Sequence, residues 1–213
     1  MKHKIFITKP ILPRLNLVVR DLKKIWNSKI LTNSGPYNKI LEKKLCNYLS
    51  CNNLSIVSNG TDALILAIKA LNLKGDIITS PFSFPATVHA INWTGNTPIF
   101  VDINPNTFNI NEDLIERAIT KKTVAILATN CYGNPCEFSK IYLIAKKHKL
   151  KIIYDSSHCF GIAQAEQSIL KKGDISTISF HATKVYNTFE GGAVICKNSK
   201  KKKKNRFVKK FWY

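Results

Sequence analysis

The sequence lacks the features of a membrane-spanning or exported protein. No apolar run reaches the ~18 residues that a transmembrane helix needs. The opening residues, MKHKIFITKPILP, are interrupted by Lys9, Pro10 and Pro13 before the apolar region of a signal peptide can form. We therefore expect no membrane span, no convincing signal peptide and a cytoplasmic location.

The six cysteines form no Cys-x-x-Cys pair, and few of the five histidines lie near them. A structural zinc site normally shows such pairs at fixed spacing, so we expect no metal site. Unpaired cysteines are typical of buried free thiols in a reducing compartment, which agrees with the expected cytoplasmic location.

Acidic residues are scarce, because 13 Asp and Glu stand against 33 Lys and Arg and give a formal charge of +20. Residues 197–213 hold nine of the basic residues and no acidic one, which leaves 24 basic against 13 acidic residues in the body of the chain. A moderately basic body suits phosphate-bearing ligands. A lysine-rich compositional bias would give the same excess without any function.

The 213 residues, 45% of them apolar, suffice for one domain with a sizeable core. Short apolar runs of strand length alternate with stretches in which apolar residues recur at helical spacing. This alternation predicts a doubly wound α/β domain with seven strands. Helices are expected over 15–29, 37–49, 112–120 and 139–148 and directly after Gly60 and Thr87, with strands beginning near residues 55, 76, 98, 124, 151, 174 and 192.

One lysine has surroundings that favour chemistry. Lys184 lies in SFHATKVYNTFEGGAV, on a short connection between two expected strands. Loops held by rigid strands are common positions for catalytic side chains. A desolvated lysine loses its proton more readily, and the free amine attacks carbonyls to form a Schiff base. With 33 basic residues in the chain, an ordinary solvated lysine is the alternative.

Two further motifs follow expected strands. Gly60 and Thr61 open an Ala- and Leu-rich helix, whose unpaired N–H groups could hold a phosphate or could simply form an ordinary helix cap. Asp155 ends the expected strand KIIYD, and His158 follows it three residues later. Ligands of open parallel sheets bind beyond the carboxyl ends of the strands, although a lone Asp there is often a turn residue or a helix cap.

These motifs, in this order, resemble those of the DegT/DnrJ/EryC1/StrS family of sugar aminotransferases, which use pyridoxal phosphate (PLP) and have the fold type I architecture. The resemblance implies the large domain of that fold, with a mostly parallel seven-stranded sheet flanked by helices. It implies the following roles: Lys184 as the Schiff-base lysine, Gly60, Thr61 and Ser179 as phosphate ligands, Asp155 at the pyridine nitrogen, His158 at the phenolic oxygen, and Phe84 stacked on the ring, with Phe82 as the fallback.

The resemblance also implies an activity. We expect transfer of an amino group from L-glutamate to a nucleotide-linked keto-sugar, with dTDP-4-keto-6-deoxyglucose as the best match, for cell-surface polysaccharide such as lipopolysaccharide. The family's sites lie at a homodimer interface, so a homodimer is expected. A related branch with histidine at the lysine position performs dehydration, and Lys184 argues against that reaction.

The chain departs from the family pattern at several positions. Ser156 and Ser157 replace more usual alanines, and Cys159 replaces another small residue. We expect an N-terminal helical segment at 1–50, a PLP-binding large domain at 51–198 and a basic tail at 199–213, with the family's small C-terminal domain missing by truncation. The alternative is a non-catalytic remnant whose tail, with its interleaved aromatics, binds polyanions incidentally; binding of nucleic acid is not expected.

Overall fold

The computed structural model describes residues 5–6, 8–32 and 34–197. The expected basic tail at 199–213 lies outside these residues, as do residue 198 of the expected large domain and Asn33 of the expected N-terminal segment. Within the described residues, no helix combines the length and the apolar character needed to cross a membrane.

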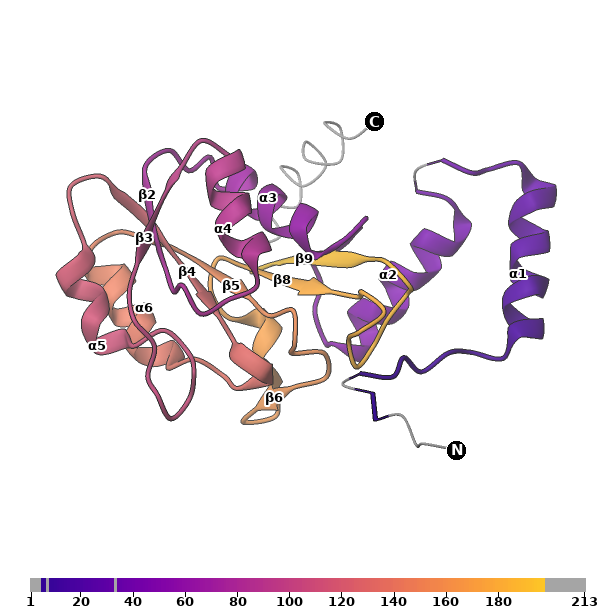
Figure 1. Cartoon of the computed structure of the whole chain (residues 1–213). Helices are drawn as coiled ribbons and strands as arrows, with labels where there is room; N and C mark the ends of the chain where they lie inside the picture. The colour runs from indigo at the N-terminus through magenta and orange to yellow at the C-terminus, as the bar shows by residue number, and fades with distance from the viewer. Residues whose placement is uncertain (1–4, 7, 33, 198–213) are drawn as a thin grey trace.

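A seven-stranded sheet forms the centre of the molecule (Figure 1), in the order β1-β9-β8-β5-β4-β2-β3. Its strands are β1 (Leu54–Val57), β2 (Asp76–Thr79), β3 (Thr97–Phe100), β4 (Thr123–Thr129), β5 (Lys151–Asp155), β8 (Ile175–Ser179) and β9 (Gly192–Cys196). The pairs of β2 with β3 and β4, of β4 with β5, and of β5 with β8 are parallel. Only β9 runs against its two neighbours, so the sheet is mostly parallel, as expected.

Helices cover both faces of the sheet. One core contains α3 (Gly60–Ala70) and α4 (Pro85–Trp93), packed on residues such as Ile77 and Ile153. The other contains α2 (Pro36–Tyr48), α5 (Glu112–Ile115) and α6 (Phe138–Lys147), packed on residues such as Ile78 and Ile152. Neighbouring residues of one strand therefore enter opposite cores, which explains the continuous apolar character of these strands.

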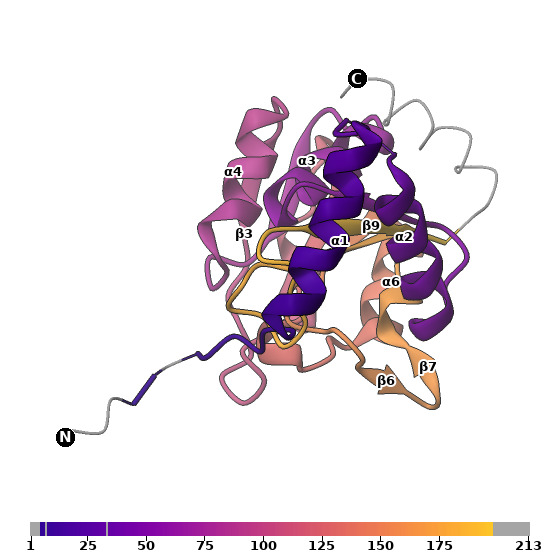
Figure 2. The same ribbon diagram turned by 90° about the vertical axis from the view of Figure 1, so that its right-hand side faces the viewer.

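Helix α1 (Leu15–Ser28) lies at one end of the molecule, with α2 between it and the sheet (Figures 1 and 2). It has no buried residue. By contrast, Leu45 of α2 is buried in the core beside the sheet, and so is Leu49, the residue directly after the helix. The two helices of the expected N-terminal segment thus differ in how they contact the core, and the division at residue 50 stays a prediction.

Two local elements differ from the expected pattern. The helix expected over 112–120 is shorter in the structure. Its α-helical part ends at Ile115, and one 3-10 turn, Glu116–Ala118, follows it. Hydrogen bonds between Thr120 and Thr123 close a separate turn there and lead the chain into β4. The short hairpin of β6 (Ala163–Gln164) and β7 (Gln167–Ser168) was not expected. Another 3-10 turn, Ile169–Lys171, leads from this hairpin toward β8.

Candidate functional site

The candidate site lies at the carboxyl edge of the sheet, where β4, β5 and β8 end side by side. Thr129 at the end of β4 is the register partner of Asp155 at the end of β5. Asp155 in turn is paired with Thr177 of β8, two residues before Ser179. The parallel register therefore places the functional groups of three strands at one edge, where ligands of such sheets bind.

Asp155 is buried and held by hydroxyl groups from two elements. The residue as a whole is only 4% exposed. Thr87 Oγ1, in the first turn of α4, donates to Asp155 Oδ2 at 2.8 Å, and Ser157 donates to Oδ1 through Oγ at 2.6 Å and through its backbone N at 3.2 Å. Both carboxylate oxygens are thus fixed. The role of Thr87 was missed in the sequence because only the fold brings it to Asp155.

Lys184 lies in the loop between β8 and β9, which short-range hydrogen bonds hold in shape. Lys184 N donates to His181 O at 2.9 Å, and Thr188 N donates to Phe180 O at 2.9 Å. The Lys184 side chain is half-buried, and this desolvation lowers the pKa of its amine, while the Asp155 carboxylate acts in the opposite direction. Lys184 therefore holds more free amine at a given pH than a solvated lysine does.

His158 belongs to the same charged cluster. Partial desolvation lowers the pKa of its imidazole; the Lys184 charge lowers it further, and the Asp155 charge opposes both. Its Nδ1 accepts from the backbone N of Tyr132 at 3.2 Å, and the two rings stack at 5.9 Å with 6° between their planes. A neutral ring that accepts at Nδ1 carries its proton on Nε2. His158 is thus prepared to donate a hydrogen bond from Nε2.

A second group forms around the start of α3. A Cβ added to Gly60 would lie 2.9 Å from Ser179 Cβ and 3.3 Å from its Oγ, so the turn before α3 touches the end of β8. A Cβ on Gly192 would lie 2.5 Å from the backbone O of Asn59. Gly60 and Thr61 occupy the first turn of the helix, where backbone N–H groups have no intrahelical acceptor. These N–H groups and the Ser179 hydroxyl form a cradle suited to a phosphate.

The loop at residues 80–84, between β2 and α4, is here called the aromatic loop, and its two phenylalanines have different surroundings. Phe82 stacks on Phe108 at 5.6 Å and meets Tyr132 edge-on at 6.4 Å. Phe84 directly precedes α4 and is 75% exposed, without a ring contact among the described residues. Phe82 is thus committed to a cluster of protein rings, whereas the Phe84 ring is available to cover a ligand. Its stacking on a cofactor stays a prediction.

Three buried hydroxyls near this edge have no hydrogen-bond partner among the described residues. They belong to Thr79 and Thr129, the last residues of β2 and β4, and to Ser83 of the aromatic loop. Buried polar groups are normally satisfied by protein, water or ligand. Together with the phosphate cradle and the Lys184, Asp155 and His158 cluster, they give this edge donors and charges that fit a phosphorylated pyridine.

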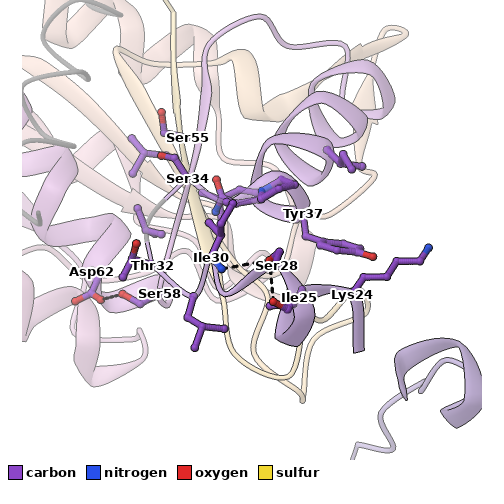
Figure 3. Close-up of a pocket in the computed structure, with 18 of the residues that line it drawn as sticks. Lys24, Ile25, Ser28, Ile30, Thr32, Ser34, Tyr37, Ser55, Ser58 and Asp62 are labelled. Carbon is purple, nitrogen blue, oxygen red and sulfur yellow. Dashed lines mark hydrogen bonds between the residues drawn. The ribbon is translucent and has the colours of Figure 1, made fainter. Parts of the chain in front are cut away.

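A cavity of about 740 Å³ is lined mainly by residues of α1, α2, β1 and α3 and of the segments that join them (Figure 3). Ser58 and Asp62, which are hydrogen-bonded to each other, lie at one end, and Lys24 and Tyr37 at the other. Its lining also includes Ser34 and Gly35, which directly precede α2. None of the candidate cofactor residues lines the cavity, so it does not by itself mark the catalytic position.

The fold is that of the large domain of PLP-dependent transferases of fold type I, a class in which this domain carries a Schiff-base lysine on a loop of its mostly parallel sheet. The chain belongs to the DegT/DnrJ/EryC1/StrS aminotransferase family, whose model matches residues 16–211. The enzymes of this family use PLP as their cofactor.

Similar proteins agree with this assignment. A dTDP-4-amino-4,6-dideoxy-D-glucose transaminase from Shigella dysenteriae is 48% identical over 213 residues, which is all of this chain and 58% of the relative. The structure of DesI with its TDP-sugar product has a TM-score of 0.90 at 31% identity, over 94% of this chain and 51% of DesI. A sugar aminotransferase from Streptococcus pneumoniae in its PLP form has a TM-score of 0.88 at 26% identity, over 99% of this chain and 57% of that one. The chain thus spans little more than half the length of these proteins.

Proposed function

We propose that this chain holds the PLP of a sugar aminotransferase that moves an amino group from L-glutamate to a nucleotide-linked keto-sugar, dTDP-4-keto-6-deoxyglucose. The observation that carries the proposal is a half-buried Lys184, with its pKa lowered by desolvation, in the field of a buried and doubly hydrogen-bonded Asp155. The name of the 48% identical relative supports the choice of sugar nucleotide.

Each candidate residue has a place in this scheme. The N–H groups of Gly60 and Thr61 and the hydroxyl of Ser179 would hold the phosphate, and Phe84 would cover one face of the ring. Asp155 would pair with the pyridine nitrogen, and His158 would donate from Nε2 to the phenolic oxygen. When bound, PLP withdraws electrons from the bonds of the carbon that carries the amino group.

Lys184 supplies the acid and base chemistry. Its Nζ, as a free amine, takes the proton from the α-carbon of the amino donor and returns a proton during the transfer. Desolvation assists this step because it disfavours the ammonium form. The Asp155 charge acts in the opposite direction and favours the ammonium form, in which Nζ carries the proton that it must return.

The setting of the reaction follows from family resemblance. We propose a cytoplasmic homodimer in which the partner completes the site, and a product used for cell-surface polysaccharide such as lipopolysaccharide. The alternative is that these 213 residues form a non-catalytic part of such an enzyme, which would be consistent with a span of 58% of the Shigella relative.

The first test is an absorbance spectrum of the purified 213-residue protein with PLP. The proposal predicts a band of lysine-bound PLP that disappears in Lys184→Ala but persists in Lys43→Ala, a control at an exposed lysine of α2. Assays with L-glutamate and keto-sugars then separate the two readings. A band with transfer supports the enzyme, a band without transfer supports the non-catalytic alternative, and a band that ignores Lys184→Ala contradicts the assignment of the lysine.

A further inference from the structure

A second cavity, of about 680 Å³, opens at the edge of the sheet opposite the candidate site. It lies where β5 begins at Lys151, where residues 171–174 lead into β8, and where β9 ends before Lys197. The five residues of β5 separate this edge from Asp155 by roughly 13 Å at the strand rise. The cavity is therefore distinct from the cradle at Gly60 and Ser179.

The lining of this cavity is strongly basic. It contains six lysines, which define what we call the lysine pocket: Lys146, Lys149, Lys151, Lys171, Lys172 and Lys197. Among the described residues, its one acidic lining residue is Asp174, whose Oδ1 lies 3.8 Å from Lys151 Nζ and whose Oδ2 accepts from Ile152 N at 3.1 Å. Asp174 thus helps to fix the start of β5 and offsets only part of the charge.

The other five lysines of the pocket form no ion pair with a carboxylate within the described part of the chain. By contrast, two lysines of α6 that lie outside the pocket do form ion pairs. Lys140 pairs with Glu112 at 3.0 Å, and Lys147 pairs with Glu116 at 2.9 Å. Lysines of α6 outside the pocket thus have acidic partners, whereas the described residues give the pocket one carboxylate, that of Asp174, for six lysines.

Aromatic rings hold two of these lysines without neutralising them. Lys172 Nζ lies 5.7 Å from the ring centroid of Phe138, and Lys197 Nζ lies 5.9 Å from that of Tyr142. Gly173 lets the segment that leads into β8 lie close against the sheet, because a Cβ added to it would lie 2.9 Å from the Tyr154 ring. Two of the six ammonium groups therefore lie over aromatic rings of α6, one of them over the half-exposed Tyr142.

We propose that the lysine pocket binds a small oligophosphate anion, such as inorganic triphosphate or the phosphate chain of a nucleotide. Converging like charges repel one another, and a concave wall concentrates their field, so a multivalent anion relieves the repulsion and is attracted strongly. Lysine ammonium groups are common phosphate ligands. The volume lies within the range of small-molecule sites, and the pocket can accept several phosphates.

The test is titration calorimetry of the full 213-residue protein with inorganic triphosphate and, separately, with ATP. The pocket variant is Lys149→Gln with Lys171→Gln. The control is Lys43→Gln with Lys44→Gln, which removes the same charge from exposed positions of α2 outside the pocket. Both variants keep residues 198–213, so any binding by that segment is common to them, and thermal unfolding checks that both fold.

We expect one triphosphate per chain, with affinity reduced roughly tenfold or more in the pocket variant, because two nearby charges are lost. The control should change affinity by less than about twofold, since salt screens distant charges. Tighter binding of ATP would assign the nucleotide as the ligand, and equal binding would assign the phosphate chain alone. Absence of binding, or equal loss in both variants, would overturn the proposal.

Discussion

Thr87 and Ser157 show how two single hydroxyls determine the position of Asp155. Thr87 is fully buried and donates to Oδ2, whereas the partly buried Ser157 donates to Oδ1 from both its side chain and its backbone. Removing one hydroxyl therefore leaves the two oxygens of this carboxylate with different numbers of hydrogen-bond donors. Thr87→Val leaves Oδ2 without its donor, and Ser157→Ala leaves Oδ1 with the backbone donor.

We expect Thr87→Val to lower the free energy of unfolding by about 1–3 kcal/mol, because it leaves a buried acceptor unsatisfied. Ser157→Ala should lower it by only about 0.5–1.5 kcal/mol, the usual range for a single hydrogen bond. Denaturant unfolding of the two variants in parallel measures both. A larger loss for Ser157→Ala would show that Oδ1 carries the constraint instead.

Gly60 is the second residue at which one atom decides the outcome. An added Cβ would lie 2.9 Å from Ser179 Cβ, so Gly60→Ala forces the start of α3 away from the end of β8. We expect a loss of about 1–3 kcal/mol in stability from overpacking and weaker binding of PLP through its phosphate. The matched control is Gly35→Ala, where the nearest atom is 3.7 Å away. Equal effects on PLP binding would argue against the phosphate cradle.

At the scale of elements, the sequence predicts the sheet well because its strands are continuous apolar runs between clear turns. It does not predict the hairpin of β6 and β7, whose two-residue turn consists of Ala165 and Glu166, both in the left-handed region. Such turns normally contain Asn or Gly, so the usual signal is absent. The same limit applies to Thr87, since its contact with Asp155 joins residues 68 positions apart.

The loops after β5 and β8 are coupled through charge, and this coupling is measurable without any cofactor. The Lys184 charge lowers the pKa of His158, and the Asp155 charge raises it. Lys184→Met should therefore raise the His158 pKa toward 6.5, while Asp155→Asn should lower it further. An NMR titration of the imidazole resonances measures both shifts. Lys140→Met, at a lysine paired with Glu112, is the control and should leave His158 unchanged.

The signs of these shifts also fix the pH dependence. Because the folded-state pKa of His158 lies below its usual value, the unfolded chain binds more protons in the interval between the two, and stability rises with pH there. Lys184→Met brings the two pKa values closer and should flatten this rise. An unchanged His158 pKa in both variants would show that the two loops do not meet in solution.

At the scale of the whole molecule, stability is concentrated in the two cores around the sheet, and α1 contributes little to it. Leu22 of α1 is 54% exposed, whereas Leu64 of α3 is 1% exposed and packed between helix and sheet. Both positions are helical, so Leu→Ala changes helix propensity alike at each. We expect Leu22→Ala to change the free energy of unfolding by less than about 0.5 kcal/mol and Leu64→Ala to lower it by about 2–5 kcal/mol. Denaturant unfolding at two protein concentrations provides the measurement. A large loss for Leu22→Ala would show that the apolar side of α1 is covered in solution, and a dependence of that loss on concentration would assign the cover to a second copy of the chain.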